Sequence, residues 1–162
     1  MYECIGIDFD VDKRVIKDIL LDVFSDLQFH YFDEGGTYEI ENEESVDSSS
    51  INFSLVKTKS EFPVKLQLYG TPEDDTDKRE LYLAQIISDR LQCRTITGFL
   101  PPDVPKGYPY DSIIFDKGIS YLTDDSNTIW ADGEGGEVRI IKPFALGNFH
   151  FDKSGRFQTG SS

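Results

Sequence analysis

Apolar and polar residues follow two different periods along this chain. A short apolar run from Cys4 to Phe9 reads as a strand. After it, apolar residues recur three, four or one positions apart, the spacing of one helix face: Val11, Val15, Ile16, Ile19, Leu20, Val23, Phe24 and Leu27. The pattern predicts an amphipathic helix, with Asp10 or Asp12 accepting hydrogen bonds from the free amides of its first turn.

After this helix, apolar and polar residues alternate with a period of two. Ile51 to Thr58 and Phe62 to Tyr69 both alternate apolar with polar residues, which indicates an antiparallel sheet with one buried face. Ahead of them, Gln28 to Phe32 and Thr37 to Glu41 are expected to form a hairpin around Gly35-Gly36. The sequence further predicts a turn at Asp116-Lys117-Gly118 and short strands at 112–115, 119–122, 128–131 and 137–141.

A second helix is expected near Asp77. The stretch Asp77-Lys78-Arg79-Glu80 has the form of a capping box, and apolar residues continue at helical spacing to Leu91. The proline-rich segment 99–111 is expected to be irregular. The whole pattern predicts an α+β fold, mainly an antiparallel sheet with two amphipathic helices packed on it. We expect one domain over residues 1–153 and a flexible polar tail over 154–162.

The net charge of the chain limits the classes of partner that it is expected to bind. The chain has 162 residues, of which 38% are hydrophobic, so it can bury a core. Its 30 acidic residues outnumber 16 basic ones, giving a net charge of -14. Such a field repels nucleic acid and anionic membranes and attracts basic proteins. No segment has the length of apolar sequence that a membrane span needs, and the acidic start does not resemble a signal peptide, so we expect a cytoplasmic protein.

The sequence patterns that could indicate a catalytic site are weak. Asp8 and Asp10 follow an apolar strand, as in metal-dependent phosphatases, but the later segments do not alternate as βαβ units, and capping is the favoured role. His30 and His150 lie in aromatic-flanked strands without a nucleophile motif. Cys4 and Cys93 are far apart and are expected to be small buried residues of a reducing compartment. We therefore expect no enzyme activity, no cofactor and no metal.

The acidic residues gather in predicted loops, and some lie beside large aromatic side chains. Aromatic anchors within a charged rim are typical of binding hot spots. Trp130 is the strongest candidate, with an expected contribution of about 2 kcal/mol or more. The residues expected to contact a partner are Tyr108, Tyr110, Asp124, Asp125, Trp130, Asp132 and Glu134.

In size, acidity, helix-on-sheet pattern and Tyr, Trp, Asp and Glu in loops, the whole chain resembles bacterial immunity proteins of contact-dependent-inhibition and related polymorphic toxin systems. The resemblance implies a protein that binds a basic toxin domain, such as a nuclease, and covers its active site or an adjacent surface. No motif carries functional residues over from that class. Two alternatives remain open: a nucleic-acid mimic that inhibits a DNA-handling protein, and a metal-dependent hydrolase using Asp8 and Asp10.

Overall fold

A computed structural model describes residues 2–33, 50–98, 112–124, 128–129, 134–135, 137–147 and 149–159. It contains two helices and ten strands in these ranges: β1 (Glu3–Ile7), α1 (Lys13–Val23), β2 (Gln28–Tyr31), β3 (Ser50–Lys57), β4 (Val64–Tyr69), α2 (Thr76–Leu91), β5 (Arg94–Thr97), β6 (Ser112–Asp116), β7 (Ile119–Asp124), β8 (Thr128–Ile129), β9 (Glu134–Gly135) and β10 (Arg139–Pro143).

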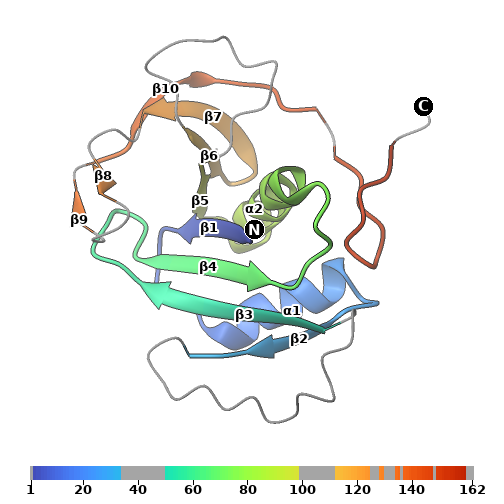
Figure 1. Cartoon of the computed structure of the whole chain (residues 1–162). Coiled ribbons are helices and arrows are strands. Elements are labelled where there is room, and N and C mark those ends of the chain that lie inside the picture. The colour runs from blue at the N-terminus through green and yellow to red at the C-terminus, as the bar shows by residue number, and fades with distance from the viewer. Residues whose placement is uncertain are drawn as a thin grey trace.

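Eight of the strands form one curved sheet. Their order is β10-β7-β6-β5-β1-β4-β3-β2, and β8 pairs separately with β9. Every neighbouring pair in the large sheet is antiparallel except β2 and β3, which run parallel. The sheet bends around α2, and α1 lies beside the β2–β3 end (Figure 1). The predicted α+β class and its mainly antiparallel sheet are thus confirmed.

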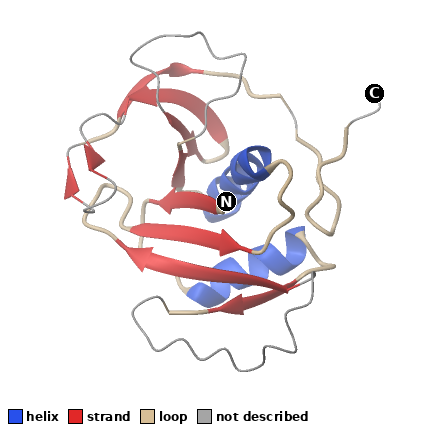
Figure 2. Ribbon diagram, in the orientation of Figure 1, coloured by secondary structure: helices blue, strands red, loops and turns tan. Residues whose placement is uncertain are grey.

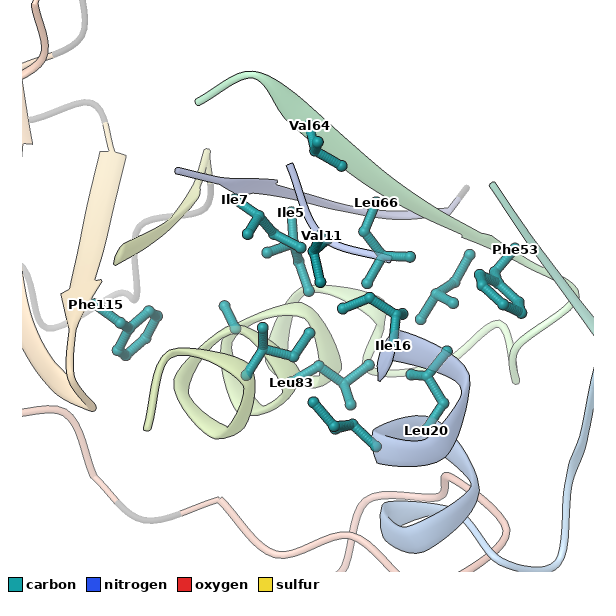
Figure 3. Close-up of a cluster of buried hydrophobic side chains, with 14 of the residues drawn as sticks. Ile5, Ile7, Val11, Ile16, Leu20, Phe53, Val64, Leu66, Leu83 and Phe115 are labelled. Carbon is teal, nitrogen blue, oxygen red and sulfur yellow. The ribbon is translucent and has the colours of Figure 1, made fainter. Parts of the chain in front are cut away.

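Both helices pack against the concave face of this sheet. Figure 2 shows the helices in blue and the strands of the sheet in red. The strands contribute alternate residues such as Ile5 and Leu66, and the helices contribute Ile16, Leu20 and Leu83 to the same buried cluster (Figure 3). Within the described residues, neither helix combines the length and the apolar character needed to cross a membrane.

The first helix forms as its pattern predicts. Asp12 is the N-cap, and its carboxylate accepts from the Arg14 N–H at 2.7 Å. Ile16, Ile19 and Leu20 are its buried residues. The turn at 116–118 is also confirmed, with positive φ at Lys117 (51°) and Gly118 (84°), the conformation of a tight hairpin.

The strand β2 has a neighbour that the sequence pattern did not predict. Its described partner is β3, in parallel register from Gln28↔Ser50 to Tyr31↔Phe53. The predicted hairpin partner, Thr37 to Glu41, lies outside the described residues, as does the irregular segment 99–111.

The capping box expected at the start of α2 is wrong. The helix begins at Thr76, and the cap residue Asp75 has a left-handed backbone (φ 63°) and makes no side-chain cap. Glu80 does not turn back to its own helix. Its carboxylate reaches the adjacent sheet, where it accepts from the Cys4 N–H at 3.0 Å and from the Gly98 backbone. Glu80 therefore joins α2 to the ends of β1 and β5.

Arg79 and Glu3 form a buried ion pair beside this contact. Both side chains are at most 1% exposed, and Arg79 Nη1 lies 2.6 Å from Glu3 Oε1. The guanidinium also donates to three backbone carbonyls, those of Pro72, Asp74 and Gly155. One side chain thus fixes β1, the β4–α2 connection and a C-terminal turn to each other.

The C-terminal residues are part of this packing. Phe151 and Phe157 pair across a short hairpin and their rings lie 5.5 Å apart. Gly155 is buried with φ 79°, and an added Cβ would lie 3.3 Å from Leu27, so a larger residue would be strained there. A tail was expected from residue 154, but the described chain still contacts α2 at Phe157, whose ring lies 4.4 Å from the Lys78 ammonium.

A smaller apolar cluster covers part of the convex face. It consists of Phe62, Ile96, Ile114 and Val138. The alternating pattern predicted that Phe62 begins the strand and lies on its buried face. The strand β4 begins only at Val64, however, and Phe62 packs over Gly6. A Cβ on Gly6 would lie 2.6 Å from Ile96, so this close approach requires glycine.

We expect Arg79→Met to lower the free energy of unfolding by about 3–5 kcal/mol, because it leaves the Glu3 carboxylate buried without its cation. Urea unfolding monitored by circular dichroism would measure the change. Arg90→Met is the matched control on the same helix, since its pair with Asp22 is exposed and should contribute less than about 1 kcal/mol. Equal losses for both variants would contradict this role of Arg79.

Glu80 should make stability depend on pH. Burial raises its pKa from an ordinary 4.5 to about 7, with smaller increases from Asp77 and Glu3. Because the pKa is higher in the folded state, the associated stability is present below pH 4.5 and is lost as the pH rises through 7, a loss of about 3 kcal/mol. Glu80→Gln should remove this loss in unfolding series across that range, whereas Glu73→Gln, at an exposed site, should keep it.

Candidate functional site

The convex face of the sheet carries a continuous row of side chains across three strands, β4, β3 and β2. The register pairs Tyr69 on β4 with Asn52 on β3, and Asn52 with His30 on β2. Tyr2, just before β1, packs on Tyr69 at the other end of the row. Since side chains alternate between the two faces of a strand, this row lies opposite the hydrophobic core.

Three aromatic rings gather at one end of the row. The Tyr2 and Tyr69 ring centroids lie 4.9 Å apart, and those of Phe32 and Tyr69 lie 5.4 Å apart. Tyr2 is 44% exposed, and Phe32 and Tyr69 are half-buried. We call Tyr2, Phe32 and Tyr69 the aromatic surface.

Polar contacts hold the central ring in place. The Tyr69 hydroxyl donates to Gln67 Oε1 at 2.9 Å, and the Ser54 hydroxyl donates to the same oxygen at 3.4 Å. Ser54 and Gln67 are themselves buried on this face. The Tyr69 ring is therefore fixed before any partner arrives, so ordering it on binding costs little entropy.

Negative charge adjoins the aromatic surface. Asp33 follows Phe32 and is exposed. Burial raises the pKa of Tyr31, and the neighbouring Asp33 carboxylate raises it further. The described chain stops after Asp33 and resumes at Ser50, and the sequence between them, 34–49, contains six acidic residues and no basic one. In the sequence, Phe32 of the aromatic surface is thus followed directly by an acidic segment.

This arrangement has the composition of a protein-binding surface. Large, rigid aromatic rings supply contact area, and a charged surround supplies selectivity and steering. Sequence reasoning missed these three residues because their meeting depends on strand order. One signal was available: Tyr69 is an aromatic residue in the outward, otherwise polar phase of its strand.

The sequence-predicted contact residues are not brought together by the described structure. Tyr108, Tyr110, Asp125, Trp130 and Asp132 lie outside the described residues, and only the backbone of Glu134 is described, in the β8–β9 pair. Their role in binding stays a prediction.

Asp124, the remaining predicted contact residue, is 7% exposed, and its carboxylate accepts from Arg139 at 3.3 Å. This ion pair joins the ends of β7 and β10. Asp124 therefore offers little surface to a partner in this structure.

The carboxylates considered for metal chemistry belong to ion pairs. Asp8 Oδ2 lies 3.2 Å from Arg94 Nε, and Arg94 Nη1 lies 2.7 Å from Glu61 Oε1. Asp10 pairs with Lys57. These contacts tie the end of β1 to β5 and to the connection before β4. Among the described residues, no group of three or more His, Cys, Asp or Glu is placed to hold a metal ion.

The histidines and cysteines are dispersed. His30 and His150 are exposed, Cys93 is buried, and Cys4 is half-buried. Burial raises the pKa of the Cys93 thiol to about 12, which disfavours the reactive thiolate.

Three aspartates on α1 and in the turn after it bear on the nucleic-acid-mimic alternative. Asp18, Asp22 and Asp26 are exposed and four residues apart. Asp22 is paired with Arg90 of α2 at 2.5 Å, so the row includes a cation at its centre. Its charge pattern is thus interrupted, unlike the unbroken charges of a phosphate backbone.

No protein-family model, curated protein or solved structure matches this chain.

We expect millimolar Mg²⁺ or Mn²⁺ to leave the Tm unchanged, because the Asp8 and Asp10 carboxylates are paired with cations of the chain. Asp8→Asn should lower stability by about 1 kcal/mol through loss of its partly exposed ion pair. Differential scanning calorimetry would measure both effects. A metal-dependent rise in Tm that Asp8→Asn abolishes would favour the hydrolase alternative.

Proposed function

We propose that this protein is a cytoplasmic immunity protein that binds a basic toxin domain, such as a nuclease, and neutralises it by covering its active site or an adjacent surface. The observation that carries the proposal is the aromatic surface, in which exposed Tyr2 and half-buried Phe32 and Tyr69 lie together on the sheet face opposite the core. In the sequence, Phe32 is followed by exposed Asp33 and by the six acidic residues of 34–49.

The aromatic surface and the negative charge contribute to binding in different ways. Burial of aromatic rings contributes affinity, because it removes large apolar areas from water at a low entropy cost. The net charge of -14 favours encounter with a positively charged protein and disfavours nucleic acid. A toxin domain that acts on nucleic acid carries basic residues around its active site, which makes it complementary to this chain.

The decisive experiment uses the toxin domain encoded immediately upstream of this gene. Co-expression should restore growth of cells producing that domain, and the purified proteins should form a complex whose association rate falls as salt rises. Failure to bind and failure to protect would overturn the proposal. Binding of several unrelated DNA-handling proteins with similar affinity would favour the mimic instead.

Tyr2→Ala should weaken the complex by about 2 kcal/mol, because Tyr2 is the most exposed ring of the aromatic surface. Ile119→Ala is the matched control, since Ile119 is 58% exposed at the distant β6–β7 turn. Trp130→Ala tests the earlier prediction for the β8–β9 region in the same titrations. If Ile119→Ala and Trp130→Ala weaken binding while Tyr2→Ala does not, the contact surface lies elsewhere.

A further inference from the structure

The edge strand β2 presents backbone groups that the described structure does not use. Phe32 N–H donates to Phe53 O at 3.0 Å, on the β3 side. Successive N–H groups in a strand point in opposite directions, so those of Phe29 and Tyr31 point away from β3. Across the described ranges, β2 has only β3 as a neighbour.

The two edges of the sheet differ in how they are protected. The edge strand β10 contains Arg139, Lys142 and Pro143, and its pairing with β7 has a register shift between Ile140 and Lys142. Charged residues, proline and bulges are the devices that block strand addition to an edge. The strand β2, Gln28-Phe29-His30-Tyr31, has no proline, no lysine or arginine and no register shift.

The surroundings of β2 favour a basic occupant. Exposed carboxylates lie on either side of it in the chain, at Asp26 and Asp33. On its convex side, His30 continues the row that leads through Asn52 to the aromatic surface. An extended basic segment at this edge would contact acidic groups with its side chains and the sheet with its backbone.

We propose that β2 receives an extended segment of the basic partner as an additional strand of the sheet. This inference rests on the proposed function and specifies how the partner is held. The Phe29 and Tyr31 backbones supply the hydrogen bonds, as in other cases of strand addition. The aromatic surface and the exposed carboxylates of Asp26 and Asp33 then select which segment binds.

Amide hydrogen exchange with residue resolution tests this geometry, with the upstream-encoded toxin domain as the probe. In the free protein, the Phe29 and Tyr31 amides should exchange faster than those of His30 and Phe32. In the complex they should slow by at least about tenfold, the effect of one hydrogen bond, while the β10 amides stay unchanged. A complex without this slowing would overturn strand addition and leave the proposed function standing. No complex at all would overturn both.

A pair of variants at one position isolates the backbone contribution. Tyr31→Ala and Tyr31→Pro both remove the ring that packs on Phe53, but only proline also removes the outward N–H. Tyr31→Pro should bind at least about tenfold more weakly than Tyr31→Ala, with circular dichroism used to confirm that both fold. Equal affinities would contradict the proposal.

A second copy of this chain is the competing occupant. Protection of Phe29 and Tyr31 that appears in the free protein and grows with its concentration would assign the edge to self-association and overturn the basic partner. Light scattering over the same concentrations would report the accompanying rise in mass.

Discussion

The Glu3–Arg79 ion pair is the interaction on which the rest of the structure depends. It lies where the first strand, the long helix and the C-terminal turn meet, and it is closed to water. A guanidinium suits this position because its planar array of donors can serve a carboxylate and several carbonyls at once, which a lysine could not do. Here Arg79 serves Glu3 and carbonyls from two distant connections. Tyr2, next to Glu3 in the sequence, is thereby held beside Tyr69 of the adjacent strand β4.

Periodicity was sufficient to predict the first helix, strands β3 and β4, and the α+β class. Those features depend on which face of one element is apolar, and that information is local. The start of α2 shows the limit. The sequence Asp77-Lys78-Arg79-Glu80 is compatible with two roles of Glu80: capping its own helix, or accepting a hydrogen bond from Cys4. Only the position of the neighbouring sheet decides between these two roles. The parallel pairing of β2 with β3 was missed because strand order is not local either.

The candidate site was less predictable than the fold for a related reason. Tyr2, Phe32 and Tyr69 come from three separate parts of the sequence, and the sheet order β1-β4-β3-β2 brings them to one face. Composition predicted a contact surface of aromatic residues among acids, and proximity in sequence assigned it to Trp130 and Tyr108, which lie outside the described residues and stay predictions. The sequence also does not show which acidic residues are buried. Glu3 and Glu80 count in the formal net charge, but they are not on the surface that a partner would contact.

The unequal edges of the sheet also bear on stoichiometry. A sheet that is open at both ends can take up strands repeatedly and grow into fibres. In this molecule the bulge, the charges and the proline of β10 obstruct growth on one side. Strand addition at β2 would therefore end after a single event. If a partner binds at β2, the asymmetry favours a closed complex of one chain with one partner over an open-ended assembly.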